Sequence, residues 1–251
     1  MAELERRTAP VLGVPIDVIG WQTALDRLMA WGASRESRYV TICNAHVVVT
    51  ASRDAGYHAV IASSDMATPD GAPVAWMLRR LADPNQPKIS GPDLMHELLR
   101  TCASRGVGVY FFGSTPETLA RLNAVVERNY PGLNVAGSCS PPFRAATDEE
   151  DAQQVLDINA SGAGLVFVGL GCPKQERWMA EHRGRVKAVM LGVGAAFDFH
   201  AGTVSRAPHW MQRNGLEWLH RLASEPRRLW KRYLVTNTLF VVGAVRQLAT
   251  R

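Results

Sequence analysis

Several common sequence features are missing from this chain of 251 residues, and each absence excludes a class of protein. No stretch reaches the roughly 20 uncharged apolar residues that a membrane-spanning helix needs. Residues 1–8 are charged rather than apolar, so no secretion signal is visible there. We therefore expect a protein that stays in the cytoplasm.

Patterns for disulfides and metal sites are missing as well. The chain has four widely spaced cysteines, which are Cys43, Cys102, Cys139 and Cys172. They form no Cys-x-x-Cys pair and have no nearby histidine at metal-ligand spacing, so we expect reduced, mostly buried thiols. The chain also lacks an Asp-x-Asp motif, the usual carboxylate pair that holds a metal against a nucleotide diphosphate. We expect no metal and no cofactor, because arginines can balance phosphate charge instead.

The residues that are present indicate an α/β fold. Hydrophobic residues make up 47% of the chain, which is enough for a substantial core. Short apolar runs alternate with longer helical patterns, as is typical of a Rossmann-like, mostly parallel sheet with flanking helices. The apolar runs predict buried strands at residues 39–43, 66–68, 107–112, 165–170 and 188–193.

Two helices are clear from their capping signals. Residues 116–128 follow Ser114 or Thr115 as the N-cap residue, and their apolar side chains are spaced for one buried face. Residues 148–160 open with four acidic side chains, which are favourable at the positive end of a helix dipole. Residues 131–142 are rich in Gly, Ser and Pro and predict a flexible loop.

The basic charge is confined to the last fifth of the chain. Residues 203–251 hold nine basic and two acidic residues, a net +7, so the other 202 residues must sum to −2 to give the total of +5. We predict an α/β body at residues 1–202 and a helical appendage at 203–251, with two or three helices broken near Pro226.

Aromatic residues are interleaved with the bases of this appendage, and a mostly apolar run follows at residues 233–245. If the stretch is one helix, Arg221, Arg228 and Arg232 share a face, because they are seven and four residues apart. This pattern favours contact with a polyanion or a membrane surface.

Two glycine-containing loops follow predicted strands and lead into helices. One starts at Gly113, and the other spans residues 169–176. Such strand ends are where ligands bind in open α/β sheets, and helix N-termini attract phosphate. Neither loop matches the dinucleotide or P-loop fingerprint, so a nucleotide without those motifs is the better prediction. The second loop supplies the candidate residues Gly171, Pro173, Lys174, Gln175 and Glu176.

Asp70 and Gly71 close another predicted strand. Alone they are a common turn dipeptide. We expect Asn44, Gly91 and Asp93 to gather with them at one edge of the sheet, where the Asp70 carboxylate could act as a general base on a hydroxyl group.

Taken together, these segments resemble the WecG/TagA/CpsF glycosyltransferases of bacterial cell-surface polysaccharide assembly over about residues 12–233. The motifs that carry the resemblance are Asn44-Ala45, Pro69-Asp70-Gly71, Gly91-Pro92-Asp93-Leu94, Gly171-Cys172-Pro173-Lys174-Gln175-Glu176, Arg206-Ala207-Pro208 and Gly215-Leu216-Glu217-Trp218-Leu219. The Pro-Lys-Gln-Glu and Gly-Leu-Glu-Trp-Leu elements in this order are highly specific.

The resemblance implies transfer of a sugar from a UDP-sugar donor to a sugar on undecaprenyl diphosphate, with inversion and without a tightly bound metal. It places the enzyme on the inner face of the plasma membrane, in exopolysaccharide, enterobacterial-antigen-like or teichoic acid synthesis, as a possible homo-oligomer. It aligns Asp70 with the proposed base and implies an appendage that closes over the active site. The arginines expected to bind the acceptor's diphosphate are Arg206, Arg221, Arg228 and Arg232.

The chain departs from the family pattern at two places. Thr41 stands three residues before Asn44 instead of two, and Lys88 stands where the family tends to have arginine. We therefore carry over Asn44 but not Thr41.

Two other functions compete with this hypothesis. A nucleic-acid-binding protein would explain the basic, aromatic-rich appendage, but the net charge of −2 on the rest of the chain argues against it. A nucleotide-dependent oxidoreductase would suit the fold but lacks the glycine fingerprint.

Overall fold

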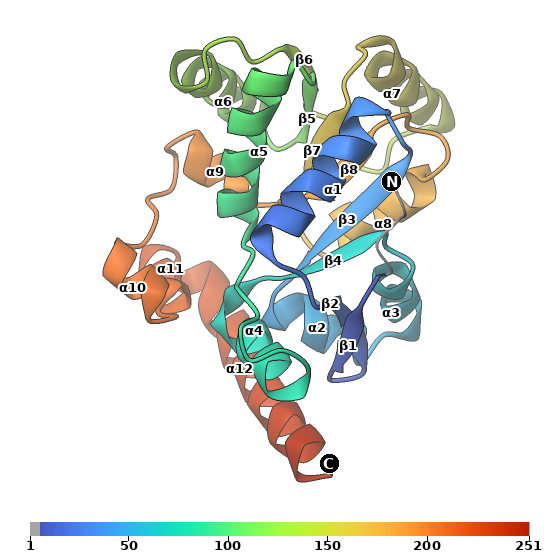
Figure 1. Ribbon diagram of the computed structural model, residues 1–251. Coiled ribbons are helices and arrows are strands. Elements are labelled where there is room, and N and C mark those ends of the chain that lie inside the picture. Colours follow the sequence, from blue (N-terminus) through green and yellow to red (C-terminus); the bar gives the residue numbers. More distant parts are fainter. Residues whose placement is uncertain (1–5, 251) are drawn as a thin grey trace. The chain divides into compact units, whose positions relative to one another are not determined.

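A computed structural model describes residues 6–250, and Figure 1 shows its helices and strands. The main sheet has six strands, in the order β4 (Met66–Pro69), β3 (Arg38–Cys43), β8 (Val189–Gly192), β7 (Leu165–Gly169), β5 (Val109–Gly113) and β6 (Val135–Cys139). The pairings from β3 through to β6 are parallel. The fold is α/β and Rossmann-like, as the alternating pattern predicts, and the five predicted strands are confirmed.

The chain divides into two compact units. Unit 1 comprises Met1–Gly20, Ile42–Ser90 and Ser205–Arg251, and unit 2 comprises Trp21–Thr41 and Gly91–Val204. The chain passes from unit 2 to unit 1 inside β3, after Thr41.

Unit 2 contains the buried centre of the sheet. Strands β5, β7 and β8 are almost fully buried, which is why they read as continuous apolar runs rather than alternating ones. The rings of Phe111, Phe167 and Phe197 pack together, with centroids 5.7–5.9 Å apart. The helices of this unit are α1 (Trp21–Ala33), α5 (Gly91–Arg105), α6 (Pro116–Asn129), α7 (Asp148–Ala160), α8 (Lys174–His182) and α9 (Ala196–His200).

Two helices of unit 2 begin where their capping residues predict. The hydroxyl of Thr115 accepts a hydrogen bond from the N–H of Thr118 at the start of α6. At the start of α7, Thr147 and Glu150 form a reciprocal capping box. The predicted helices are therefore confirmed in position, with Thr115 rather than Ser114 as the first cap.

The prediction of a flexible loop at residues 131–142 is wrong, because strand β6 lies within it and pairs with β5. This strand is at the edge of the sheet and only partly buried, so it lacks an apolar run. Its glycine has a packing role, since a Cβ on Gly137 would lie 2.5 Å from the Tyr110 ring. The small residues that suggested a loop let the strand approach this ring.

Unit 1 begins with a hairpin that the sequence did not predict. Strands β1 (Thr8–Val11) and β2 (Val14–Asp17) pair in antiparallel register. Leu12 and Gly13 form the turn with φ values of +50° and +82°, as the favoured two-residue hairpin turn requires. Each strand has only four residues and contains a proline, which obscures the strand pattern.

The remaining elements of unit 1 are α2 (Ala45–Ala51), α3 (Ala55–Ala62), α4 (Gly71–Leu81), α10 (His209–Arg213), α11 (Glu217–Ser224) and α12 (Pro226–Ala249). The basic segment thus forms three helices, with the predicted break at Glu225 just before Pro226. Helix α12 packs on α2, and the amide of Gln247 bonds to the backbone of Leu12 and Pro10 at 2.8 and 2.6 Å. Residues 205–251 therefore share a compact unit with residues 1–20 and 42–90, while their role as an appendage stays a prediction.

All four cysteines are free thiols, two of them buried and two partly buried. Within residues 6–250, no helix is long and apolar enough to cross a membrane.

Candidate functional site

Asp70 lies between strand β4 and helix α4, at the N-cap position of that helix. Its backbone N–H donates to the carbonyl of Cys43, the last residue of β3, at 3.1 Å. The side chain does not make the usual capping bond to the first turn of α4, although Asp at this position commonly does. Gly71 follows with a φ of +77°, which favours glycine and turns the chain sharply at the carboxylate. A simple capping role therefore does not account for Asp70.

Asn44 orients this carboxylate. Its side-chain oxygen accepts hydrogen bonds from the backbone N–H groups of His46 and Val47 at 3.0 and 3.2 Å, and so caps helix α2. With the oxygen committed to the cap, the amide nitrogen faces the other way and donates to Asp70. The structure thus brings together Asn44, Asp70 and Gly71, which the sequence predicted to meet at one sheet edge.

The environment of Asp70 favours a carboxyl group that exchanges its proton near neutral pH. Burial raises its pKa from 3.8 to about 6, and the charge of Glu217 also raises it. The charge of Lys88 and the hydrogen bonds from Asn44 and Gly71 lower the pKa but do not cancel the effect of burial. A base with a pKa just below the working pH can accept a proton efficiently during a reaction.

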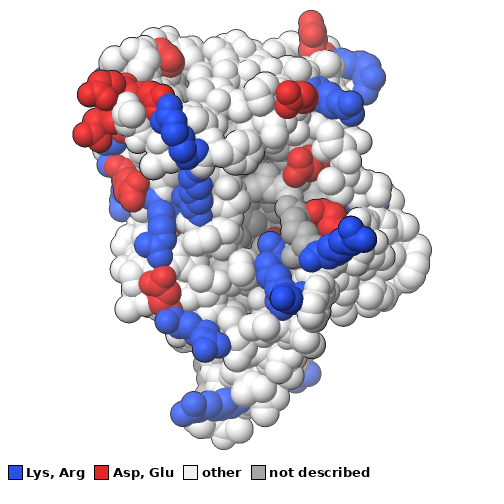
Figure 2. All heavy atoms as spheres, turned by 180° about the vertical axis from the view of Figure 1, so that it is seen from behind, with Lys and Arg blue, Asp and Glu red and all other residues white. Residues whose placement is uncertain are grey.

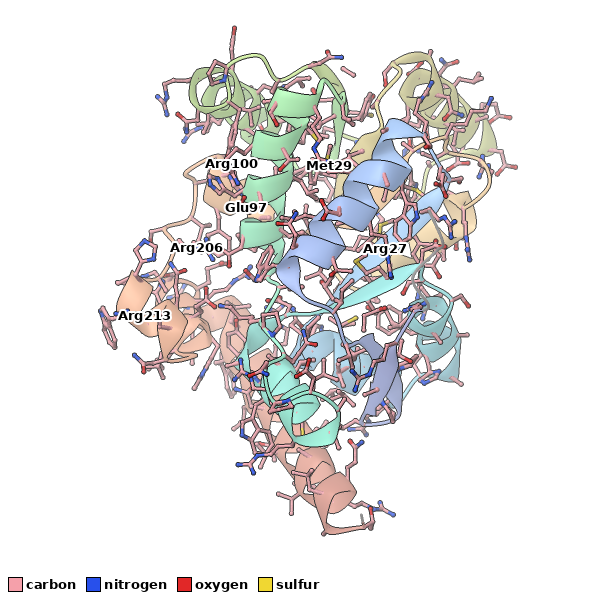
Figure 3. The ribbon with its side chains drawn as sticks, in the orientation of Figure 1. Arg27, Met29, Glu97, Arg100, Arg206 and Arg213 are labelled. Carbon is pink, nitrogen blue, oxygen red and sulfur yellow. The ribbon has the colours of Figure 1, made fainter. Side chains whose placement is uncertain are left out.

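A cluster of opposite charges lies beside this carboxyl group. The Nζ atom of Lys88 is 2.5 Å from one carboxylate oxygen of Glu217, the first residue of α11. The guanidinium of Arg206 is 3.7 Å from the other oxygen. Arg206 comes from the segment that precedes α10, where Figure 3 labels it together with Arg213. We call Lys88, Arg206 and Glu217 the charge cluster.

A close backbone approach holds Glu217 near Asp70. Gly215 has a φ of +72°, and a Cβ at this position would lie 2.7 Å from the Cβ of Ala72 in the first turn of α4. Only a glycine permits this contact without a shift of the first turn of α4. The segment that leads into α11 therefore lies directly against the start of α4.

The single helix on which the arginine stripe depends does not form, so the three arginines do not share the face of one helix. Because the helix breaks at Glu225, Arg221 lies in α11, while Arg228 and Arg232 lie in α12. Arg221 is 4.0 Å from the carboxylate of Glu225. The side chain of Arg228 lies outside the part of the chain that the structure describes.

The charge of Arg232 instead acts on the ring of His46. Burial and the charge of Arg232 together lower the pKa of His46. The Nδ1 atom of His46 is 3.4 Å from the hydroxyl of Thr236, one turn further along α12. The guanidinium of Arg232 also lies 5.5 Å from the centre of the Tyr233 ring.

In unit 2, the two predicted loops meet at the ends of β5 and β7. The N–H of Ser114 donates to the carbonyl of Gly169 at 3.0 Å. A Cβ on Gly113 would lie 2.7 Å from the carbonyl group of Gly169, and Gly113 has a φ of +116°. Packing therefore accounts for the glycine at 113, and its contact with a donor stays a prediction.

The second loop has a buried frame and an exposed edge. The side chain of Gln175 accepts from the N–H of Gly171 at 3.2 Å and donates to the Gly192 carbonyl at 3.0 Å and to Glu176 at 2.8 Å. Gln175 and Glu176 are buried, so they shape the loop from inside. The exposed residues, which are the ones open to a ligand, are Gly171, Pro173 and Lys174.

Unit 2 also has a hollow of about 390 Å³ between α1 and α5. Its lining consists of Trp21, Leu25, Asp93, His96 and Glu97, and Figure 3 labels Glu97 on α5. Asp93 thus faces a hollow that offers an aromatic ring and hydrogen-bond acceptors. Gly91 is buried at the start of α5 and does not line this hollow.

A comparison with known protein families decides among the functional hypotheses. The family model described as the glycosyl transferase WecG/TagA/CpsF family matches residues 9–251, nearly the whole chain. The chain belongs to this family. As a WecG/TagA/CpsF glycosyltransferase it uses a sugar donor and an acceptor, and a role in cell-envelope polysaccharide synthesis fits. The match favours this role over nucleic-acid binding and over an oxidoreductase.

Sequence reasoning missed Glu217, which the structure places in the candidate site of this WecG/TagA/CpsF glycosyltransferase. The residue stands in the Gly-Leu-Glu-Trp-Leu motif and is one of only two acidic residues among the 49 residues from 203 to 251. An isolated acidic residue in a basic segment is the signal that could have drawn attention to it.

Proposed function

We propose that this glycosyltransferase moves a hexose-type sugar from a UDP-sugar to a sugar on undecaprenyl diphosphate, with inversion. The observation that carries the proposal is the Asp70 carboxyl group, whose pKa is raised to about 6 and which Asn44 orients. In the proposed step, the Asp70 carboxylate accepts the proton of the acceptor hydroxyl while that oxygen bonds to the anomeric carbon. The bond from this carbon to the phosphate oxygen breaks, and UDP leaves with its electron pair. A single displacement of this kind inverts the anomeric centre.

We assign the phosphate charges to cationic side chains rather than to a metal. Lys88 lies beside Asp70, Arg206 shares the Glu217 carboxylate with Lys88, and Arg221 and Arg232 add charge from α11 and α12. Arginine suits this role because its planar group can bind two phosphate oxygens at once. We assign donor binding to the exposed edge at Gly171–Lys174, which leads into helix α8.

Helix α12 supports a position on the membrane surface. It exposes an apolar stripe made of Trp230, Leu234, Val235, Val241, Val242 and Val245. Their spacing keeps them on one face of the helix, which exposed Lys231 shares and exposed Arg246 borders. In Figure 2 the lower end of the molecule, where Figure 1 places the end of α12, shows Lys and Arg in an otherwise uncharged surface. Such a surface binds lipid headgroups and the outer part of the acyl region.

The test of the catalytic assignment is release of UDP from a panel of UDP-sugars, with and without a short-chain lipid-diphosphate-sugar acceptor. We expect acceptor-dependent release from one donor, and the Asp70→Asn variant should lose at least about a hundredfold in kcat, the usual contribution of a general base. Asp54→Asn is the matched control, because Asp54 is a true N-cap whose oxygen accepts from Tyr57, a bond that asparagine retains. Unchanged turnover in Asp70→Asn would refute the assignment.

The test of the membrane assignment is flotation with vesicles that contain anionic lipid. Val241→Glu should weaken binding, because it puts a charge into the apolar stripe. Leu156→Glu is the matched control, since Leu156 is exposed to a similar degree (61% against 59%) but lies on α7 in unit 2. Equal binding of both variants would contradict the proposed role of α12.

A further inference from the structure

The charge cluster contains two cations and one anion that come from three separate parts of the chain. Lys88 precedes α5, Arg206 precedes α10, and Glu217 opens α11. Each oxygen of the Glu217 carboxylate faces a different cation, at 2.5 and 3.7 Å. The three side chains remain 20–31% exposed, while the Nη2 atom of Arg206 that faces Glu217 is buried. A ligand can therefore approach the cluster from solvent, and this nitrogen becomes accessible when the Glu217 carboxylate moves.

We infer that Lys88 and Arg206 form a diphosphate subsite, and that the carboxylate of Glu217 covers it until a diphosphate displaces it. This inference rests on the proposed function, because it takes the diphosphate of a substrate as the ligand. Glu217 is therefore a positioning residue and not a catalytic one: it presents to the two cations the same kind of oxygen pair that a phosphate group would present.

The chemistry of the cluster favours exchange of one anion for the other. A diphosphate carries more negative charge and more acceptor oxygens than a carboxylate, so it can satisfy Lys88 and Arg206 together. A partly exposed ion pair contributes little to stability, so such a ligand can displace it.

The covering carboxylate also keeps Lys88 from pairing fully with Asp70. The groups that face the Asp70 carboxyl are Lys88, Glu217, and the hydrogen-bond donors of Asn44 and Gly71. If Lys88 had no other anion, it would bind the Asp70 carboxylate and weaken it as a base. Glu217 holds Lys88 before the diphosphate arrives, and the diphosphate holds it afterwards.

The experiment measures binding of inorganic pyrophosphate by calorimetry to the full-length protein. Glu217→Gln should bind about three- to tenfold more tightly than wild type, because the competing anion is removed. Lys88→Gln should bind more weakly, and in the double variant the gain from Glu217→Gln should be lost. Glu36→Gln is the control for net charge, because Glu36 pairs with Arg38 in unit 2, and it should bind as wild type does.

UDP and farnesyl diphosphate identify the source of the diphosphate. Whichever of the two gains affinity in Glu217→Gln is the substrate half that uses the subsite, and a gain for either supports the inference. Unchanged or weaker pyrophosphate binding by Glu217→Gln would overturn it, as would an equal gain in Glu36→Gln. These measurements need no sugar transfer, so a failure of the proposed reaction in the Asp70 test remains distinguishable from a failure of the subsite.

Discussion

Replacing Asp70 by asparagine should stabilise the protein at neutral pH while it removes turnover. Burial raises the pKa of this carboxyl from 3.8 to about 6 in the folded protein. The folded state therefore disfavours the ionised form, and ionisation costs stability wherever the group is charged. Asparagine has nearly the same shape, carries no charge and can still accept the hydrogen bonds from Asn44 and Gly71.

The size of the gain follows from the difference between the two pKa values. A pKa difference of about 2 corresponds to about 3 kcal/mol at most in the free energy of unfolding. Asp70 is partly exposed, and solvent screening reduces the expected gain to on the order of 1–2 kcal/mol. The sign depends on pH. Below the unfolded pKa both states are protonated and the variant gains nothing; the gain grows as pH rises toward about 6 and is complete above it.

Urea denaturation of the wild type and of Asp70→Asn, near pH 4 and near pH 8, measures this difference. We expect similar midpoints at the lower pH and a higher midpoint for the variant at the upper pH. Equal midpoints at both values would show that Asp70 is not held in a desolvated state. A lower midpoint for the variant at the upper pH would show that ionised Asp70 stabilises the fold, and would reverse the reasoning.

Three further predictions follow from other contacts. The value of kcat/KM should fall about tenfold per pH unit below about 6, where Asp70 becomes protonated. In Glu217→Gln this acid limb of the pH profile should move to lower pH, because removal of a negative charge lowers the pKa of Asp70. Profiles of kcat/KM against pH for both proteins test the direction of the shift. Gly113→Ala should lower the free energy of unfolding by about 2 kcal/mol or more, since the new Cβ would lie 2.7 Å from a backbone carbonyl. The same change at Gly162, which has open space around it, should cost only about 1 kcal/mol because of its positive φ. Urea denaturation midpoints of the two variants test this difference. Asp151→Asn should lower the free energy of unfolding by about 1–3 kcal/mol near neutral pH, because Asp151 bonds to His182 and Arg185. These partners outweigh the effect of burial and hold the pKa of Asp151 low. The loss of stability should therefore shrink as pH falls through that lowered pKa, which urea denaturation at two pH values detects.

The parts of the fold that could be predicted from the sequence are those fixed by local pattern. Strands β5, β7 and β8 are buried on both faces, so their apolar runs are visible without any structure. Strand β6 was missed because it is a half-exposed edge whose Gly137 is set by the Tyr110 ring, a neighbour on another strand. Local composition cannot report such a contact.

The candidate site divides in the same way. The meeting of Asn44 and Asp70 could be predicted, because each follows a strand and parallel strand ends share one edge. The pairing of Lys88 with Glu217 could not, since 129 residues separate them and neither has a local signal for the other. The arginine stripe failed for a local reason: Pro226 starts a new helix and removes the register on which the spacing argument depended.

The composition of unit 1 has a consequence for how the protein is made. This unit joins Met1–Gly20 and Ile42–Ser90 to Ser205–Arg251, and Gln247 near the end of α12 bonds to Leu12 near the start of the chain. A ribosome releases the N-terminal segments long before α12 exists, so α2 lacks this packing partner until α12 has been synthesised. The Asp70 neighbourhood receives Glu217 only in the same late step. A chain that is cut short before α11 therefore carries Asp70 but lacks the side chains that complete its surroundings, and we expect such fragments to be both unstable and inactive.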